Sequence, residues 1–482
     1  MVPSDEHECA WKAHALELKK QLDDVAEKQR IQQEQLEALQ KKLFGKSTEK
    51  MPPMEREARR GEAPDPEKSQ LKRRANAELR SAKIKTEVVD VKVPATEQHC
   101  PHCDGGEFTP LGKGKPSSVT EYVQGYFRKR IFRRETLACA CGQHVVTAAV
   151  PDKVVDRTQY GPGFMAHLVV SKCCDSIPLY RMEQQFARLG IPMSRSTMTD
   201  LFHRTGELVA PLAARIIELI AQSEIVLADE TPMPVQDARK KPYIWTFIAG
   251  NFVAYRFSLT RSGDTPKAVL GGTTGTLVVD MYTGYNSVTG VDGRRRAGCL
   301  SHARRKFFKA VDAAPEAKFP LEIIRELYVL ERQIKIAGQS GNAEHARMRW
   351  QESLPLMDKL YVWLSHEKPN HPPKSLMGKA ISYTLKNWQA LTRFITNTAI
   401  PPDNNRSERS LRVVALGRKN FLFAGGKEAG ENLAALYTVV ATCVAHDLDP
   451  LAYLTDVLMR LDSTSADRID ELLPQNWAAR PP

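Results

Sequence analysis

The stretch VLADETPMPV, residues 226–235, contains a short apolar run that ends on two adjacent acids, Asp229 and Glu230. Together with the two residues before it, the segment EIVLAD (224–229) has the length and apolar content of a buried strand. Side chains alternate between the two faces of a strand, so Glu230 is predicted to point away from Asp229 if the strand continues that far. The question is what a carboxylate does at the end of a buried strand.

Two strands, a short helix and a further strand follow this strand and indicate the fold class. Two strands, PYIWTFIA (242–249) and NFVAYRFSL (251–259), are joined by a Gly-Asn turn. After a short helix closed by a Gly-Gly pair, the strand TLVVD (276–280) ends on Asp280. A β-meander followed by a helix and another strand is the order found in ribonuclease-H-like nucleases. We therefore predict a multidomain α/β protein with a ribonuclease-H-like catalytic domain over residues 216–425.

A third acid, Glu408, lies in the segment PPDNNRSERSLR (401–412). This segment is predicted to start a helix, with Asn404, Asn405 or Ser407 able to accept hydrogen bonds from the free N–H groups. Glu408 then falls in or near the first turn, where the helix dipole favours a negative charge.

The long separation between Asp280 and Glu408 predicts an insertion into the catalytic domain. The intervening stretch, about 303–390, is mostly helical in pattern and too long to be a loop. Residues 426–482, beyond the catalytic domain, are predicted to form a C-terminal helical region.

Three carboxylates on separate elements suit a divalent metal site. Magnesium takes hard oxygen ligands and keeps several waters, so Asp229, Asp280 and Glu408 would suffice, with phosphate oxygens completing each shell. Two such ions about 4 Å apart activate an attacking water or 3′-hydroxyl and stabilise the leaving oxygen. The spacing alone leaves another interpretation open, because strand-ending aspartates also cap helices or face solvent.

Residues 1–44 are predicted to form a coiled-coil helix. No proline or glycine falls in 10–44, and apolar residues recur in alternating steps of four and three. This seam consists of Leu18, Leu22, Val25, Leu36, Leu39 and Leu43, with Gln29 and Gln32 as polar members. The pattern favours a homo-oligomer, although one amphipathic helix packed on its own protein also fits it. The next stretch, 45–95, is rich in charge and proline and is predicted to be a basic linker.

Residues 96–150 carry two cysteine pairs and are predicted to form a zinc-binding module. The pair in HCPHCDGGEF (99–108) has the C-x2-C spacing that lets two thiolates reach one tetrahedral Zn2+. The pair in CACGQH (139–144) is separated by a single residue, so both cysteines or the following histidine complete the site. The candidate ligands are Cys100, Cys103, Cys139 and Cys141, with His144 as the alternative. Two unrelated buried cysteine pairs are the other interpretation.

Residues 151–215 contain two predicted helices around a glycine. In PLYRMEQQFARLGIPMSRSTMTDLFHRTG (178–206), one helix ends near Gly190 and a second, capped by a serine, follows. Such a pair fits a helix-turn-helix whose second helix, with Arg195 at its start, lies in a major groove of DNA. Helix pairs of this kind also occur in proteins that bind no DNA.

The composition favours a polyanionic partner and a cytoplasmic location. Among 482 residues, 69 lysines and arginines face 57 acids, a net charge of +12, which suits DNA. No apolar run approaches the roughly 18 residues that cross a bilayer, and the N-terminus lacks the pattern of a signal peptide, so no membrane association is expected. The clustered cysteines agree with a reducing compartment.

Five longer strings provide the most specific information. They are VLADETPMPV, VVDMYTGYN, GCLSHARRKFF, PPDNNRSERSLR and GRKNFLFAGG, in this order. Together with LYRMEQQFARLGIPMSRSTMTDLF upstream and LDPLAYLTDVLMRL downstream, they resemble the successive signature blocks of DDE transposases of the insertion sequence 66 family. The resemblance covers nearly the whole chain.

This resemblance implies roles for particular residues. In the family pattern, Asp229, Asp280 and Glu408 are the catalytic, metal-binding triad, with Mg2+ (or Mn2+) as the metal. The implied activity is that of a transposase, which binds the ends of its element, cleaves DNA and joins the 3′-OH ends to target DNA. Small accessory proteins from the same element are also implied. The family commonly has two residues within its second cysteine pair, so the single residue in CACG leaves the zinc ligands open.

Basic residues near the acids are predicted to contact DNA phosphates. The guanidinium group matches phosphate oxygens through forked hydrogen bonds, and such contacts make affinity sensitive to salt. The candidates are Arg304 and Arg305, with the run Arg294–Arg296 before them, and Arg418 and Lys419, in addition to Arg195. A solvated helix face explains some of these residues equally well.

Three questions remain open from the sequence alone. His302 fits proton transfer, DNA contact or a structural role. A ribonuclease-H-like nuclease that hydrolyses DNA without joining it would carry the same acids. A domesticated DNA-binding regulator would use only the N-terminal half, and the intact set of acids disfavours it.

Overall fold

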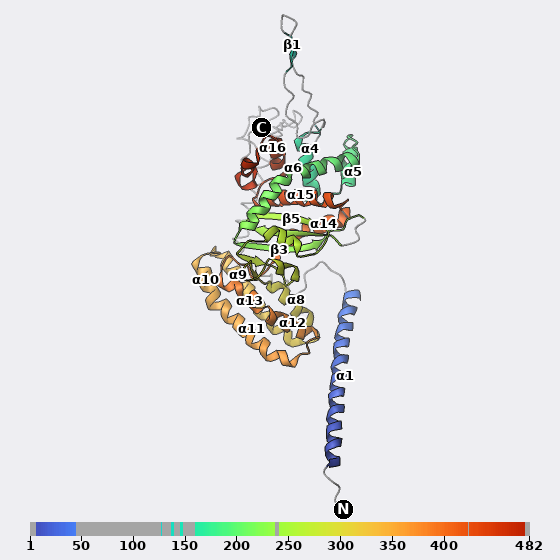
Figure 1. Ribbon diagram of the computed structural model, residues 1–482, viewed down its shortest axis with the longest axis vertical. Helices are drawn as coiled ribbons and strands as arrows, with labels where there is room; N and C mark the ends of the chain where they lie inside the picture. The colour runs from blue at the N-terminus through green and yellow to red at the C-terminus, as the bar shows by residue number, and fades with distance from the viewer. Residues whose placement is uncertain are drawn as a thin grey trace, which may run out of the picture. The chain divides into compact units, whose positions relative to one another are not determined.

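The computed structural model describes residues 6–44, 127, 136–138, 145–147, 160–236, 241–422 and 424–477 (Figure 1). Helix α1 (Glu6–Phe44) is followed by an antiparallel pair of short strands, β1 (Thr136–Ala138) and β2 (Val145–Thr147). The predicted basic linker lies outside the described residues. So do all the predicted zinc ligands, Cys100, Cys103, Cys139, Cys141 and His144.

The predicted N-terminal helix is present as α1, and its apolar seam is exposed. The exposed fractions are 47% for Leu18, 69% for Leu22, 51% for Val25 and 51% for Leu36. An exposed seam with heptad spacing is what a coiled coil requires of each of its helices, so self-association stays a prediction. Neither α1 nor any other helix in the described ranges is long and apolar enough to span a membrane.

A five-stranded mixed sheet forms the centre of residues 160–477. Its strands are β3 (Ile225–Pro232), β4 (Tyr243–Ala249), β5 (Phe252–Ser258), β6 (Thr276–Val278) and β7 (Arg295–Ala297), in the spatial order β5-β4-β3-β6-β7. The pairs β3–β4 and β4–β5 are antiparallel, and β3–β6 and β6–β7 are parallel. A tight turn joins β4 to β5 through Gly250, whose φ of 51° is a left-handed conformation that glycine adopts without strain.

Strand β3 is the middle strand, and its sequence reflects that position. Val226 and Ala228 are fully buried and Leu227 is 7% exposed, because the strand is covered on both faces. The chain becomes polar at Asp229, where burial decreases toward the end of the strand. The apolar run therefore fixes the strand in the core and brings the acid to the rim of the sheet.

Helix α15 (Lys427–Ala445) covers the free edge of β5. The hydroxyl of Thr438 accepts from the N–H of Tyr255 (2.8 Å), and that of Thr442 accepts from the N–H of Val253 (3.2 Å) and donates to its carbonyl (3.0 Å). Four helical residues rise about 6 Å and two strand residues about 6.6 Å, so the two threonines match alternate residues of the strand. The edge strand thus finds hydrogen-bonding partners within its own chain.

Helices α4 (Pro162–Cys173), α5 (Leu179–Arg188) and α6 (Arg195–Gln222) precede the sheet. The sequence predicted a short second helix in this region, which is wrong: α6 has 28 residues, because its buried positions continue from Met198 to Ile220. It leads almost directly into β3. The proposed boundary at residue 215 therefore falls inside a helix that connects the predicted helix-turn-helix to the sheet.

The C-terminal helices pack against the helices that precede the sheet. Helix α15 packs along α6, and α16 (Pro450–Arg460) packs on α4. The approach of α15 is close, since a Cβ at Gly206 of α6 would lie 2.7 Å from the Cβ of Asn432. The predicted C-terminal region thus shares one core with helices from the predicted DNA-binding region.

The stretch between β7 and the segment with Glu408 is helical. It contains α8 (Leu300–Ala310), α9 (Lys318–Ile336), α10 (Ala343–Met348), α11 (Leu354–Glu367), α12 (Leu376–Lys386) and α13 (Trp388–Thr392), which form the lower part of the molecule in Figure 1. The fully buried Arg349 anchors it: its guanidinium donates to Glu331 (2.6 and 2.9 Å) and to the carbonyls of Phe394 (2.5 Å) and Ile400 (3.1 Å). These carbonyls lie just before the segment that carries Glu408.

Candidate active site

Asp229 lies near the end of β3, directly opposite Thr246 of β4. Its Oδ1 accepts a hydrogen bond from the backbone N–H of Glu230, at 2.9 Å. Burial, with smaller contributions from the negative charges of Glu230, Asp280 and Glu408, raises the pKa of this carboxyl to about 7, against the effect of the hydrogen bond from the Glu230 N–H. Asp229 is therefore a carboxylate that a nearby cation would stabilise.

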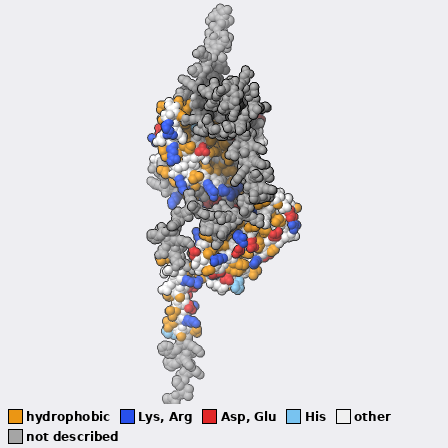
Figure 2. All heavy atoms as spheres, turned by 180° about the vertical axis from the view of Figure 1, so that it is seen from behind, with side chains coloured by type: hydrophobic (Ala, Val, Ile, Leu, Met, Phe, Trp, Pro, Cys, Tyr) orange, Lys and Arg blue, Asp and Glu red, His pale blue; other side chains and the backbone are white. Residues whose placement is uncertain are grey.

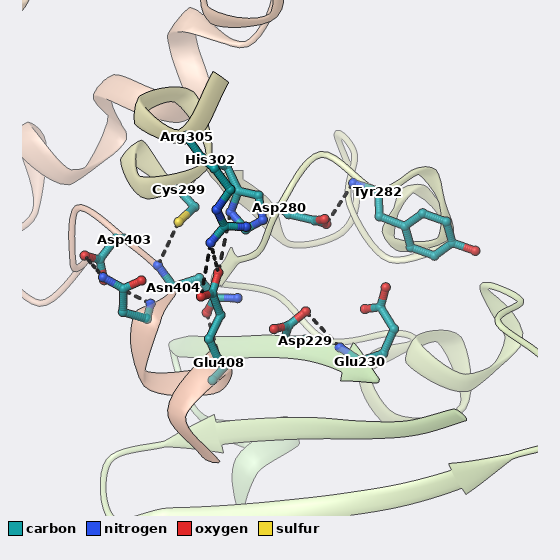
Figure 3. Close-up of polar contacts among 12 residues, drawn as sticks. Asp229, Glu230, Asp280, Tyr282, Cys299, His302, Arg305, Asp403, Asn404 and Glu408 are labelled. Carbon is teal, nitrogen blue, oxygen red and sulfur yellow. Dashed lines mark hydrogen bonds and ion pairs between the residues drawn. The ribbon is translucent and has the colours of Figure 1, made fainter. Parts of the chain in front are cut away.

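Asp280 follows β6, which runs parallel to β3. Parallel neighbours end at the same edge of a sheet, so β6 brings Asp280 to the edge at which Asp229 lies. The Oδ1 of Asp280 accepts from the backbone N–H of Tyr282, at 2.9 Å (Figure 3).

Glu408 lies in the first turn of helix α14 (Asn405–Phe421), as predicted. Its carboxylate faces helix α8: both oxygens lie 3.4 Å from Nη2 of Arg305, and Oε1 lies 3.9 Å from Nδ1 of His302 (Figure 3). The Glu408 side chain is 31% exposed, so water and ligands reach it. Its position at a helix N-terminus suits a negative charge.

The three acids share one region without forming a closed cluster. Their mutual influence is seen at Asp229, where the charges of Asp280 and Glu408 both raise the pKa. In the described ranges, no three His, Cys, Asp or Glu side chains are grouped closely enough to hold one metal ion. Figure 3 shows why: Asp280 turns toward Tyr282, and Glu408 turns toward Arg305. Each carboxylate has a hydrogen-bonding partner of its own.

Asn404 is a site residue whose role the sequence did not reveal. It was a candidate cap for α14, but its amide instead donates to the carbonyl of Ala228, at 2.7 Å, next to Asp229. Its backbone N–H donates to Sγ of Cys299 at the start of α8 (3.2 Å), and its Oδ1 accepts from Ser407 (2.8 Å). Fully buried, Asn404 thus joins the three elements that carry Asp229, Glu408 and Arg305. Its partner lies 176 residues away, so no local spacing signals the contact.

The carboxylate of Glu230 is held by partners other than the three acids. Strand β3 does continue past it, to Pro232. Its Oε1 accepts from Arg261 and its Oε2 from the hydroxyl of Tyr285, at 2.6 Å. Burial raises the pKa of Glu230, while the hydrogen bonds from Tyr285 and Arg261 lower it.

The basic residues predicted to contact DNA lie in different settings. Arg305 is half-exposed and pairs with Glu408, while Arg304, its neighbour on α8, is partly buried. Arg418 of α14 donates to Thr231 Oγ1 (2.8 Å) and to the carbonyl of Pro232 (2.5 Å), so it also ties α14 to β3. Lys419 is exposed. Arg195 is exposed at the start of α6 and pairs with Glu183 of α5, at 3.0 Å.

The run Arg294–Arg296 does not form a DNA-facing patch. Arg294 is fully buried and donates to Thr273 Oγ1 (2.8 Å) and to the carbonyls of Ala221 (2.6 Å) and Ser223 (2.9 Å). It ties the end of α6 to the sheet, which is a structural role. The sequence did not indicate this buried role of Arg294, which directly precedes β7.

His302 lies between the acids and the helical insertion. Its Nδ1 is buried and forms no hydrogen bond among the described residues. Burial lowers the pKa of His302 and the neighbouring Arg305 lowers it further, while the charges of Glu408 and Asp280 raise it. An imidazole near Glu408 is able to take up a proton or donate a hydrogen bond.

Comparison with known proteins identifies the family. The sequence model described as "Transposase IS66 family" matches residues 157–432, and the one described as "IS66 C-terminal element" matches residues 438–475. The chain is 34% identical to the uncharacterized protein y4jD of Sinorhizobium fredii (strain NBRC 101917 / NGR234) over 419 residues, 81% of this chain and 80% of that protein. It is 30% identical to the uncharacterized protein y4hP of the same organism over 424 residues, 82% of this chain and 75% of that protein. The chain therefore belongs to the transposase IS66 family.

Proposed function

We propose that this protein is a DDE transposase that cleaves DNA at the ends of its element and joins the freed 3′-OH groups to target DNA. Membership of the family suggests transposition and implies DNA binding and a divalent metal, typically Mg2+. The observation that carries the proposal is that Asp229 at the end of β3, Asp280 after the parallel strand β6 and Glu408 in the first turn of α14 lie in one region (Figure 3). The strand order β5-β4-β3-β6-β7 supports the ribonuclease-H-like core that this chemistry uses.

The donor set fits a hard divalent cation. Asp229, Asp280 and Glu408 offer only carboxylate oxygens, which Mg2+ and Mn2+ prefer. Burial is the main cause of the raised pKa of Asp229 and the neighbouring acids add to it, so a bound cation would stabilise the charged form of this carboxyl. When bound, two ions would activate the attacking oxygen and stabilise the leaving oxygen.

Glu408 reaches its proposed role by exchanging partners. Its carboxylate is paired with Arg305, a half-exposed guanidinium that also suits a phosphate oxygen. DNA entering the site would draw Arg305 to the phosphate and leave Glu408 free to turn toward Asp229. His302, beside Glu408, would accept a proton from an attacking hydroxyl.

The exposed face of α14 offers a path for the DNA backbone away from the acids. Arg409, Arg412, Leu416 and Lys419 are exposed and fall at steps of three, four and three residues, so they share one helix face. Figure 2 shows that lysines and arginines also gather on the body above the helical insertion, whereas both signs mix over the insertion itself. Such contacts supply salt-sensitive, sequence-independent affinity.

The N-terminal parts complete the proposal. We propose that α5 and α6, with Arg195 at the start of α6, contact the element ends, and that residues 96–150 bind Zn2+ through the predicted cysteines. The exposed seam of α1 would pair subunits as a coiled coil. The domain boundaries predicted from the sequence remain a prediction. So does the need for small accessory proteins from the same element.

Strand cleavage and joining on the element's own end sequences test this function. Wild-type protein with Mg2+ is expected to release 3′-OH ends and join them to a target plasmid, and Glu408→Gln is expected to do neither. Glu428→Gln is the matched control, since Glu428 is an exposed glutamate in the first turn of α15. Cleavage without joining would favour a hydrolytic nuclease, and DNA binding without cleavage would favour a regulator.

A further inference from the structure

The carboxylate of Glu230, one residue beyond Asp229, is buried. Its side chain is only 1% exposed. Taking a carboxylate out of water is costly unless it is paired and hydrogen-bonded, and removing one of its partners leaves an uncompensated group. The partners of Glu230 therefore indicate what this charge is retained for.

The first partner is Arg261, on the loop between β5 and α7 (Asp264–Leu270). Nε and Nη2 of Arg261 donate to the same Oε1 of Glu230, at 2.9 and 2.5 Å. The guanidinium also lies over aromatic rings, with its central carbon 3.9 Å from the centroid of Tyr282 and 5.6 Å from that of Tyr243. Arg261 is thus fixed between Glu230 and Tyr282.

The second partner is Tyr285, in the short 3-10 helix η2 (Thr283–Ser287) that follows Asp280. Its hydroxyl donates to Oε2 of Glu230 at 2.6 Å, and its buried ring packs edge-on against Trp245 of β4, with centroids 5.6 Å apart. Glu230 therefore contacts both loops, the one after β5 and the one after β6.

These two loops are also packed directly on each other. The hydroxyl of Tyr282 donates to the carbonyl of Arg261, and Ser287 Oγ donates to the carbonyl of Gly263, at 2.9 Å. A Cβ at Gly263 would lie 2.6 Å from the carbonyl oxygen of Gly284, so only glycine permits this approach. The backbone N–H of Tyr282, in turn, donates to Oδ1 of Asp280. A continuous set of contacts runs from Glu230 to Asp280.

We propose that Glu230 is a positioning residue, which through Arg261 and Tyr285 holds the loop of Asp280 at a fixed place relative to Asp229. The adjacent acids of β3 then have different tasks: Asp229 faces the metal, and Glu230 on the opposite face fixes the second ligand's loop. This inference rests on the proposed function, because it treats Asp229 and Asp280 as ligands of one metal site.

Mn2+ binding by the purified full-length protein tests the inference without relying on activity. The probe is Mn2+ alone, and the free ion is measured by electron paramagnetic resonance. Residues that orient metal ligands typically change metal affinity by about 10- to 100-fold when mutated. Glu230→Gln and Tyr285→Phe, which keep the shape of the side chain, are both expected to weaken Mn2+ binding by about tenfold.

Two matched variants control for loss of stability. Tyr453→Phe removes a buried tyrosine's hydrogen bond to the carbonyl of Leu472 (2.5 Å), and Asp456→Asn alters a part-buried carboxylate that accepts from Trp477 Nε1 (2.8 Å) and Arg460 (3.0 Å). Both lie in other parts of the fold. They are expected to lower the melting temperature about as much as Tyr285→Phe and Glu230→Gln, while leaving Mn2+ affinity at the wild-type value.

The outcomes separate the inference from the function it rests on. Loss of Mn2+ binding in Asp280→Asn, with weakened binding in Glu230→Gln and Tyr285→Phe, supports both. Loss in Asp280→Asn with wild-type affinity in the Glu230 and Tyr285 variants overturns the positioning role alone. Equal weakening in the Tyr453 and Asp456 controls also overturns it. Wild-type affinity in Asp280→Asn overturns the proposed metal site, and the positioning role with it.

Discussion

Nη2 of Arg305 lies 3.4 Å from both carboxylate oxygens of Glu408. The contact joins α8 of the helical insertion to α14. It also pairs Glu408, a proposed metal ligand, with an arginine. Both side chains are partly exposed, so the pair itself adds less than about 1 kcal/mol to stability.

Arg305→Ala is expected to have opposite effects on two kinds of binding. Without the guanidinium, Glu408 is free to turn toward a metal, so Mn2+ should bind the DNA-free protein more tightly than it binds wild type. DNA affinity should fall, and the slope of its salt dependence should decrease by about one unit, because one phosphate contact is lost. Titrations of DNA at several salt concentrations measure this. Arg347→Ala, at an exposed arginine paired with Glu344, is the control, and an unchanged slope in Arg305→Ala would contradict the phosphate contact.

Asn404→Ala is expected to lower the free energy of unfolding by about 1–3 kcal/mol, since the carbonyl of Ala228 loses its buried donor. Cleavage should fall more than this, because the ends of β3, α8 and α14 lose their common anchor. Urea denaturation and cleavage assays at a temperature where the variant is folded separate the effects. Asn420 lies on α14 and donates a comparable hydrogen bond to the carbonyl of Ser176. Asn420→Ala should therefore lower stability without a matching loss of cleavage.

The stability of the metal-free protein is expected to depend on pH through Asp229. Its pKa is about 7 in the folded protein and 3.8 in the unfolded chain, so the folded state binds the proton more tightly. The stabilisation is complete below pH 3.8 and is lost as the pH rises through 7. Asp229→Asn should therefore be more stable than wild type at pH 8, on the order of 3 kcal/mol, at about 1.4 kcal/mol per pKa unit and with partial solvent access.

Urea denaturation at pH 4, 6 and 8 without divalent ions measures this difference. It should shrink steadily toward pH 4. Asp358→Asn, at an exposed aspartate on α11, should show no such trend. A constant difference between Asp229→Asn and wild type across the three pH values would show that Asp229 titrates normally.

Arg294→Ala is expected to destabilise the fold by about 3–5 kcal/mol, because it removes a buried cation that carbonyl and hydroxyl groups surround. Arg294→Lys should not restore stability, since one ammonium cannot reach the same set of acceptors. The exposed neighbour Arg295 is the control, and Arg295→Ala should change the unfolding free energy by less than about 0.5 kcal/mol. Weakened DNA binding by a stable Arg294→Ala protein would restore the DNA-contact interpretation.

Local patterns in the sequence predicted the central strands well. The apolar runs at 224–229, 242–249 and 251–259 correspond to β3, β4 and β5, and the short helix and the strand before Asp280 correspond to α7 and β6. These elements lie in the core, and their apolar residues follow the pattern expected of buried strands. Strand β7 was missed, because three residues with two arginines look like a charged surface.

The contacts that shape the candidate site were not predictable in the same way. Asn404 meets Ala228, and Glu230 meets Arg261 and Tyr285, only after the sheet has brought distant segments together. The acids themselves were found because each ends or begins a regular element. Their orientation depends on partners that no local spacing encodes.

The hydroxyl contacts of Thr438 and Thr442 with β5 also bear on how the protein is made. A growing chain that has just left the ribosome as far as Glu408 already contains every proposed catalytic acid, yet residues 427–445 are still to come. Until they arrive, the outer edge of β5 has unpaired groups that attract strands of other chains. A copy of the protein truncated just after α14, which carries the last proposed catalytic acid, would therefore aggregate through this edge instead of acting on DNA.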